Sequence, residues 1–159
     1  MLSDSDILSR LSDGSLKIEG FEEANLTPNG YDVTIGLILI PSTGEKVSSG
    51  MAVVGGGTRF LIGTKEVISM PHDLAGQIWI RTSWARKGIV SSFGIIDAGF
   101  VGNLTFSALN ASQEPVEVRV GERFAQVVFI PLRTPSEKGY GNRSGNYQGQ
   151  RGITLEPMK

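Results

Sequence analysis

Cysteine is absent from this chain of 159 residues, and histidine occurs only once, as His72. The lack of thiols excludes a disulfide scaffold, a thiolate nucleophile, Cys-ligated zinc and iron–sulfur chemistry, and it fits a reducing compartment. A Ser-His-Asp triad or a multi-histidine metal site would have to use His72, which stands between Pro71 and Asp73, two residue types common in turns. We therefore predict that His72 is an exposed turn residue. Any chemistry should rely on carboxylates, hydroxyls and a water, with a hard cation where one is needed.

Long apolar runs and a strong excess of one charge are also missing. The longest apolar runs, such as residues 33–41, are interrupted by Thr and Gly and fall well short of the roughly 20 residues of a membrane helix. The N-terminus lacks the basic and apolar runs of a signal peptide. The net charge of −1 argues against a non-specific attraction to nucleic acids, which needs a basic face. These absences predict a cytoplasmic protein without a membrane or nucleic-acid partner.

Glycine, by contrast, is abundant: 21 glycines separate short apolar runs, a pattern typical of many short strands. The length suits a single domain. Eight or more strands with Gly and Pro turns favour an all-β antiparallel sandwich or jelly-roll barrel over alternating βα units. The predicted strands are Tyr31–Ile40, Met51–Val54, Arg59–Ile62, Glu66–Met70, Gly76–Arg81, Ile89–Ser92, Asn103–Asn110, Val116–Val120 and Phe124–Pro131.

The two ends of the chain depart from the strand pattern. Ser3 and Asp6 resemble an N-cap and an acidic first turn, residues 7, 8 and 11 form an apolar stripe, and Gly14 offers a stop, which together predict one short helix. From Pro135 onward, Gly, Ser, Asn, Gln and Arg dominate. That composition is typical of a mobile polar tail.

Polar side chains at the ends of predicted strands are candidates for chemistry. The segment Arg81–Gly88 offers three cations and two hydroxyls, which suit a phosphate, although a solvated basic turn explains it equally well. Gln126 lies within an apolar strand, where a buried amide needs either a core hydrogen-bond network or a ligand. Asp97 follows two isoleucines and precedes Ala-Gly-Phe. It would either cap a turn or act as a general base that holds a water.

The order of these segments is more specific than any one of them. Five segments resemble, in sequence, successive motifs of the dUTPase/dCTP deaminase superfamily: Gly30–Val33, Arg81–Gly88, Gly94–Gly102, Gly121–Phe129 and Tyr140–Gly152. Residues 1–8 and 146–152 resemble the deaminase-type chains of that superfamily, so the resemblance covers nearly the whole chain. It implies a dUTPase-like jelly-roll or β-clip barrel with a short N-terminal helix over residues 1–134, and a C-terminal lid over residues 135–159 that closes over the nucleotide. It also implies a homotrimer with active sites shared between subunits.

The resemblance further implies roles for single residues. Asp97 matches the aspartate that positions the attacking water in dUTPases, and Phe100 stands where dUTPases carry a tyrosine under the deoxyribose. The resemblance implies Mg²⁺ as the cofactor, held chiefly by triphosphate oxygens and water, with Asp32 near the ion but not bound to it directly. The other positions that match nucleotide contacts are Arg81, Thr82, Ser83, Arg86, Gln126, Tyr140, Tyr147 and Gln150.

One departure from the family's pattern bears on the reaction. Deaminase-type members carry a glutamate where this chain has Ser107. A hydroxyl with an ordinary pKa cannot both take a proton from water and deliver one to the base near neutral pH. We therefore predict a deoxyuridine triphosphate diphosphatase, which hydrolyses dUTP to dUMP and diphosphate. The alternative, a dCTP deaminase with or without hydrolase activity, would need another carboxylate, such as Glu45 or Glu114, from a neighbouring subunit.

Two further departures concern binding. The hairpin between Gly88 and Asp97 is shorter than the family's base-binding hairpin, which leaves the choice between uracil and cytosine open and lets Phe93 partly occupy the place of the base. Asn146 replaces a usual lysine, so Arg143 or Arg151 would have to supply the positive contact to phosphate. These departures keep a third alternative open, a nucleotide-binding homologue without catalytic activity.

Arg86 matches an active-site arginine of deaminase-type members. With Ser107 in place of the glutamate, this arginine loses its partner. Arg86 would then bind phosphate or form a contact between subunits.

Overall fold

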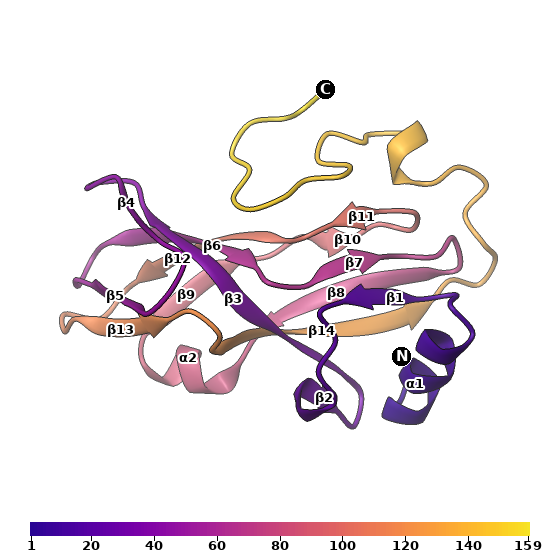
Figure 1. The fold of residues 1–159 in the computed structure, drawn as a ribbon, viewed down its shortest axis with the longest axis horizontal. Helices are drawn as coiled ribbons and strands as arrows, with labels where there is room; N and C mark the ends of the chain where they lie inside the picture. Colours follow the sequence, from indigo (N-terminus) through magenta and orange to yellow (C-terminus); the bar gives the residue numbers. More distant parts are fainter.

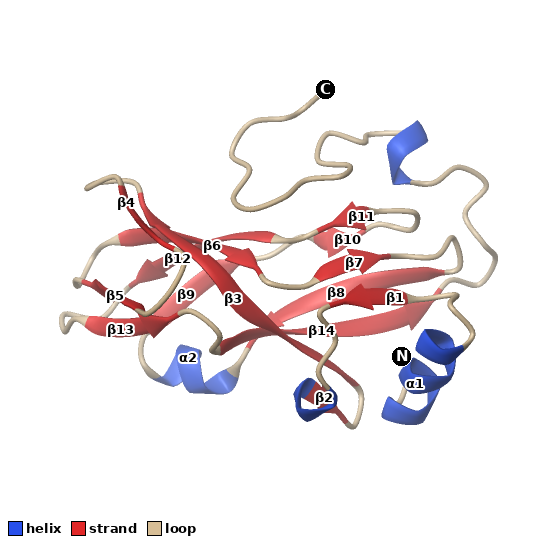
Figure 2. Cartoon of the chain, viewed as in Figure 1, coloured by secondary structure: helices blue, strands red, loops and turns tan.

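The structure, a computed structural model, describes residues 1–159. Strands dominate it, and the helices are short and lie at the periphery (Figure 2). The strands are β1 (Lys17–Glu19), β2 (Leu26–Thr27), β3 (Gly30–Ile40), β4 (Glu45–Val47), β5 (Met51–Val54), β6 (Arg59–Thr64), β7 (Val67–Ser69), β8 (Leu74–Ile80), β9 (Ile89–Ser92), β10 (Ile95–Ile96), β11 (Val101–Gly102), β12 (Thr105–Asn110), β13 (Val116–Arg119) and β14 (Arg123–Pro131). The helices are α1 (Asp4–Ser12) and α2 (Thr82–Arg86), with 3₁₀ turns η1 (Glu23–Asn25) and η2 (Tyr140–Asn142).

Every strand pairing is antiparallel, as the sequence predicts. A curled nine-stranded sheet has the order β10-β8-β14-β3-β6-β12-β9, with β2 and β4 also paired to β3. The strands β1-β7-β11 form a second sheet, and β13 and β5 form a separate pair. The C-terminal tail crosses the molecule on the side opposite α2 (Figure 1).

The predicted N-terminal helix is confirmed as α1. The Ser3 hydroxyl accepts a hydrogen bond from the Asp6 N–H, and the Asp6 carboxylate accepts one from the Ser3 N–H, so both groups complete a capping box. Ile7 turns into the core and is fully buried. Gly14, just beyond the helix, has a φ of +75°, which suits a residue without a Cβ.

All nine predicted strands are present with small shifts at their ends, but the sequence did not indicate five others. These are β1, β2, β4, β10 and β11, each only two or three residues long. Such short strands carry no readable alternation of apolar and polar residues, and pairing with neighbours defines them instead. The second helix, α2, lies within the segment that suggested a basic turn. Its anchor is Trp84, whose indole is 1% exposed and whose Nε1 donates to the Arg123 carbonyl oxygen at 2.8 Å.

An aromatic cluster links α2 to both halves of the large sheet. The Phe124 ring of β14 lies 5.5 Å from Trp84, 6.5 Å from Phe60 of β6 and 6.1 Å from Phe106 of β12, measured between ring centroids. Phe106 in turn meets Phe93 edge-on at 5.0 Å. Rings of this size bury much apolar area and favour offset or edge-on contacts. The cluster therefore holds the Phe93 loop between β9 and β10 and helix α2 to one core.

A buried carboxylate, Glu66, accepts hydrogen bonds from β3 at a point where the pairing of that strand is irregular. The pairing of β3 with β14 shifts register beside Thr34, so the Thr34 N–H is left without a partner in that ladder. The Glu66 carboxylate accepts from this N–H at 2.9 Å and from the Thr34 hydroxyl at 2.8 Å. Glu66 is 1% exposed, and burial raises its pKa despite these hydrogen bonds.

This burial predicts a pH-dependent stability. Because the folded-state pKa of Glu66 is raised, its contribution is fully present below the ordinary glutamate pKa and is lost as pH rises through the raised value. Glu66→Gln stays neutral, so the stability of the wild type relative to this variant should fall in urea unfolding as pH rises above about 4. Glu66→Ala should cost about 1–3 kcal/mol by leaving the Thr34 N–H unpaired. If the free energies of unfolding of wild type and Glu66→Gln changed with pH in parallel, the raised pKa of Glu66 would be contradicted.

None of the helices combines the length and the apolar character that a membrane crossing would require. His72 is exposed in a turn, as the sequence predicts.

Candidate functional site

Three adjacent strands build a polar pocket. In the order β8-β14-β3, Gln126 of β14 pairs with Asp32 of β3 on one side and with Trp79 of β8 on the other. Arg81 follows the end of β8, and its N–H donates to the Phe124 carbonyl oxygen at 3.1 Å. The pocket has a volume of about 280 Å³ and is lined by Thr27, Asp32, Ile80, Arg81, Thr82, Ser83 and Gln126. We call it the polar pocket.

An ion pair orients the main cation of the polar pocket. The Nε of Arg81 lies 2.8 Å from the Asp32 carboxylate, and Arg123 approaches the same oxygen at 3.5 Å. The side chain of Asp32 is only 4% exposed, and its burial raises its pKa although the two guanidinium groups act in the opposite direction. The pair fixes the guanidinium of Arg81 at the pocket wall, where it suits an anionic group such as phosphate.

Hydroxyl and amide groups complete the polar pocket. The side chain of Gln126 is half-buried, and its Nε2 donates to the Thr27 hydroxyl at 2.6 Å. Thr82 and Ser83 begin α2 and are exposed beside Arg81, because Trp84 of the same helix is buried. Of the two explanations for Gln126, the structure favours a lining residue over a core amide. Thr27 was missed because it lies outside the five segments that resemble the family's motifs; the pairing of β2 with β3 and the hydrogen bond from Gln126 place it in the pocket.

A second, mostly apolar pocket is lined by the other predicted site residues, including Asp97 and Phe100. It has a volume of about 300 Å³, within the size range of ligand pockets. We call it the apolar pocket. Its lining comes from the Phe93 loop between β9 and β10, from β8, β10 and β12, and from the C-terminal tail: Ile78, Ser92, Phe93, Gly94, Ile95, Ile96, Asp97, Phe100, Leu104, Thr105, Phe106, Tyr140, Tyr147 and Gln150.

Asp97 lies at the rim of the apolar pocket. Its carbonyl oxygen accepts from the Phe100 N–H at 3.1 Å, and this closes a turn in which Gly99 has a φ of +79°. The side chain of Asp97 is exposed. The backbone rather than the carboxylate closes the turn, so the carboxylate is free to hold a water. The Phe100 ring beneath it is 6% exposed and meets the Tyr140 ring edge-on at 5.6 Å.

The tail docks against the apolar pocket through hydrogen bonds. The Gln150 Nε2 donates to the Asn103 carbonyl oxygen at 2.6 Å, and the Asn103 Nδ2 donates to the Gly152 carbonyl oxygen at 2.7 Å. Gln148 accepts from the Val101 N–H at 3.1 Å, and its Nε2 donates to the Gly99 carbonyl oxygen at 3.1 Å. These contacts place Tyr147 and Gln150 in the pocket wall. Asn103 and Gln148 were missed, although a polar residue between Gly102 and Leu104 was a signal for Asn103.

The docking of the tail predicts that one variant, Asn103→Ala, has a more weakly held tail. Asn103→Ala removes the amide that donates to the Gly152 carbonyl oxygen and, at 3.2 Å, to the Thr64 carbonyl oxygen. The loss should cost about 1–3 kcal/mol and act mainly on the tail. Limited proteolysis should then cut beyond Pro135 several-fold faster than in wild type, while cleavage within the sheets stays slow. Equal cleavage of both proteins would exclude this role for Asn103.

The structure places the predicted residues in two groups rather than one. Asp97, Phe100, Tyr140, Tyr147 and Gln150 line the apolar pocket, and Arg81, Thr82, Ser83 and Gln126 line the polar pocket together with Asp32. The two pockets have no lining residue in common.

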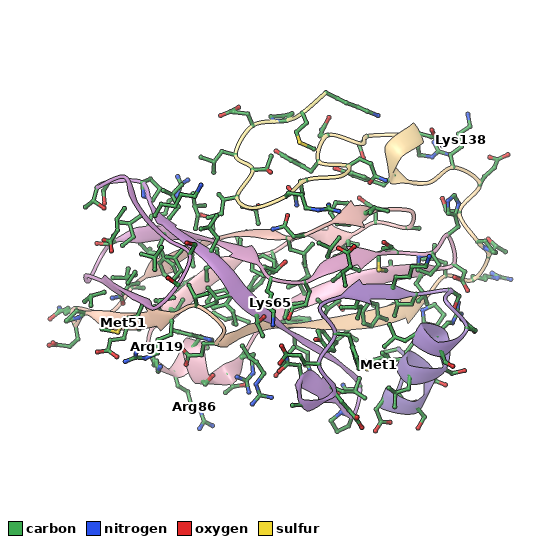
Figure 3. The ribbon with its side chains drawn as sticks, viewed as in Figure 1. Met1, Met51, Lys65, Arg86, Arg119 and Lys138 are labelled. Atoms are coloured by element: carbon green, nitrogen blue, oxygen red, sulfur yellow. The ribbon has the colours of Figure 1, made fainter.

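Several other predicted residues lie outside both pockets. Arg86 is exposed at the end of α2 and points away from the sheets on the side opposite the tail (Figure 3). Ser107 is exposed on β12 between the buried Phe106 and Ala108, and it lines neither pocket. Glu45 and Glu114 are exposed and line neither pocket.

No group of three or more His, Asp or Glu side chains gathers into a cation cage. The Asp32 carboxylate is engaged by Arg81 and Arg123. A single carboxylate, Asp97, lines the apolar pocket, so an ion bound there would need most of its ligands from a triphosphate and water.

Comparison with known proteins agrees with this architecture. The family model described as dCTP deaminase-like matches residues 1–132. A protein named dCTP deaminase from Pyrococcus horikoshii is 42% identical over 145 residues, covering 89% of this chain and 90% of that protein. A protein of Sulfolobus islandicus rod-shaped virus 1, named a probable deoxyuridine 5′-triphosphate nucleotidohydrolase, is 35% identical over 157 residues, covering 98% and 97%.

Solved structures share the fold at lower identity. A dCTP deaminase from Agrobacterium tumefaciens has a TM-score of 0.68 at 22% identity, over 80% of this chain and 46% of that one. The native EIAV dUTPase has a TM-score of 0.56 at 19% identity, over 77% and 93%. With its mostly β, antiparallel fold and this match over residues 1–132, the chain belongs to the dCTP deaminase-like family, within the dUTPase/dCTP deaminase superfamily.

Proposed function

We propose that this chain is a dUTP diphosphatase, which hydrolyses dUTP to dUMP and diphosphate with Mg²⁺. One observation carries the proposal: Asp97 is the only carboxylate that lines the apolar pocket. Hydrolysis at phosphorus needs one carboxylate to position a water, whereas deamination needs a group beside the base that can both take and deliver a proton. Ser107 stands where the resemblance to deaminase-type chains implies a glutamate, and this favours the same choice.

The nucleoside would occupy the apolar pocket, with the flat Phe100 ring leaving no room for a 2′-hydroxyl. Asp97 would accept a proton from a water as the water oxygen bonds to the α-phosphorus. The bond from the α-phosphorus to the oxygen that bridges to the β-phosphate would break, and diphosphate would leave with that electron pair. Mg²⁺ carried by the triphosphate would neutralise part of its charge.

The phosphate contacts require a second copy of the chain in this proposal. Asp97 and Arg81 lie in pockets without a common residue, yet one triphosphate would need both. A homotrimer with sites shared between subunits would place the polar pocket of one subunit against the apolar pocket of the next. Exposed apolar side chains beside the two pockets support such a contact: Trp79, which pairs with Gln126, is 56% exposed, and Ile95 of the apolar pocket is 66% exposed.

The second candidate is a dCTP deaminase. The names of the archaeal relatives at about 40% identity favour it. It requires a proton-transferring group at the base, for which a carboxylate of the neighbouring subunit, such as Glu45 or Glu114, is the available candidate. The residues that line the apolar pocket supply only the amide Gln150 and hydroxyls besides Asp97.

One assay separates the candidates. The protein is incubated with Mg²⁺ and either dUTP or dCTP, and diphosphate and ammonia are followed separately. Diphosphate from dUTP without ammonia from dCTP is the expected result. Ammonia from dCTP would establish the deaminase instead. Binding without turnover of either nucleotide would identify a non-catalytic homologue.

A further inference from the structure

The turn that follows Asp97 is bonded to the C-terminal tail at both of its ends. At the first end, the Tyr140 N–H donates to the Ala98 carbonyl oxygen at 2.8 Å. At the second end, the Gly149 N–H donates to the Val101 carbonyl oxygen at 2.7 Å. Backbone groups that are withdrawn from water need hydrogen-bond partners. The conformation of this turn therefore depends on a segment that lies far along the chain.

The side chain of Gln148 joins the tail to the middle of the same turn. Its Nε2 donates to the Gly99 carbonyl oxygen at 3.1 Å, and its Oε1 accepts from the Val101 N–H at 3.1 Å. These two backbone groups stand on either side of Phe100, whose ring lines the apolar pocket together with Asp97. An amide offers both a donor and an acceptor, whereas a carboxylate, an ammonium group or an alkyl chain offers one kind or neither. One amide thus holds the backbone before and after Phe100.

Gln148 itself lines neither the apolar pocket nor the polar pocket. It is half-buried, and the tail residues close to it in sequence, Tyr147 and Gln150, form the pocket wall instead. Contact with a nucleotide is therefore left to these neighbours. Gln148 acts on the backbone that carries the pocket residues.

From these contacts we infer that Gln148 is a positioning residue: by holding the backbone on both sides of Phe100, it couples the docking of the tail to the position of the Asp97 carboxylate. The inference rests on the proposed function and states how the tail acts on the reaction. A tail that only covered the pocket would change the affinity for the nucleotide. A tail that completes the turn of Asp97 changes the rate at which the bound nucleotide reacts, because a displacement of about 1 Å can cost roughly 10²-fold in rate.

The test begins with Gln148→Met, which keeps a similar length but removes the amide. Its kcat for dUTP should fall roughly 10- to 100-fold, while its affinity for the non-hydrolysable α,β-imido analogue of dUTP should stay close to that of wild type. The matched control is Gln113→Met, an exposed glutamine that lines neither pocket, and it should match wild type. Asn103→Ala loosens the tail at Gly152 and leaves the two hydrogen bonds of Gln148 in place, so its kcat should fall less.

A double variant separates positioning from a general support of the fold. If Gln148 acts through Asp97, then Asp97→Asn/Gln148→Met should be about as slow as Asp97→Asn alone, because residues that act as a unit lose activity non-additively. Two losses that multiply in the double variant would overturn the inference. An unchanged kcat in Gln148→Met would overturn it as well.

Hydrogen exchange of the backbone tests the same contact without turnover. In Gln148→Met the Val101 N–H loses its acceptor, so its exchange should be roughly 10-fold faster than in wild type, and exchange in β14 should not change. Equal exchange at Val101 in both proteins would overturn the inference whatever the reaction. If wild type releases ammonia from dCTP instead, the proposed function fails, and the inference stands only if Gln148→Met also slows that reaction. If wild type turns over neither nucleotide, both proposals are refuted.

Discussion

Asp97→Asn is expected to lower the rate of dUTP hydrolysis by roughly 10² to 10⁴-fold, the usual worth of a positioned general base. Asparagine has nearly the same shape as aspartate but cannot accept a proton from the attacking water. The side chain of Asp97 is exposed, and its turn is closed by the backbone, so the fold should remain intact. The rate is measured as diphosphate release at saturating dUTP and Mg²⁺, so that weaker binding does not disguise the loss.

The control for this variant is binding. Asp97→Asn should still bind the α,β-imido dUTP analogue with an affinity close to that of wild type, and its unfolding midpoint should be unchanged. A rate within a factor of about two of wild type would exclude Asp97 as the general base, because a positioned general base typically raises the rate by roughly 10²- to 10⁴-fold. A large loss of binding would instead mean that the carboxylate stabilises the bound nucleotide rather than the transition state.

Mixing two inactive variants should restore activity if the site is shared between subunits. The first is Asp97→Asn, and the second is Asp32→Asn/Arg81→Gln, which removes the cation of the polar pocket and also its buried carboxylate partner. Changing Arg81 alone would leave Asp32 buried with only the more distant Arg123, and breaking a buried pair in this way is strongly destabilising. The double variant avoids that loss of stability, so any loss of its activity reports on function rather than on folding.

The expected recovery follows from symmetry. In a ring of three subunits assembled at random from equal amounts of the two variants, roughly a quarter of the sites combine an intact Asp97 with an intact polar pocket. Each variant alone should be nearly inactive, and mixing followed by unfolding and refolding should restore roughly that fraction of wild-type turnover. Mixing without subunit exchange serves as the control. No recovery in mixed oligomers would place the two pockets in separate functions.

The N-terminal helix shows what the sequence could predict well. The cap at Ser3, the stripe through Ile7 and the stop at Gly14 are local signals, and the structure realises each of them. The same holds for the nine predicted strands, of which all but β7 extend over four residues or more, long enough for alternation or β-branched runs to be read. Helix α2 was not predicted, because its five residues are too few for a helical period and its anchor, Trp84, depends on distant partners.

The candidate site was predictable residue by residue but not as an arrangement. The motif order identified Asp97, Arg81 and Gln126 together, and the resemblance implied one site, shared between subunits, for all three. The structure assigns Asp97 to one pocket and the other two to another, because β10 and the end of β8 direct their polar residues into different pockets. No sequence pattern encodes that separation, which depends on the sheet order and on the path of the tail.

By itself, the sequence determined that this is a mostly β chain of the dCTP deaminase-like family with an aspartate at residue 97, since local patterns and ordered motifs carry that information. Only the tertiary structure decided what surrounds that aspartate. The docking of the tail through Asn103 and Gln150 forms one wall of the apolar pocket, and the Gln148 amide bonds the backbone on both sides of Phe100. The physical reason is that contacts between distant residues arise from packing and strand register, which depend on the whole chain at once.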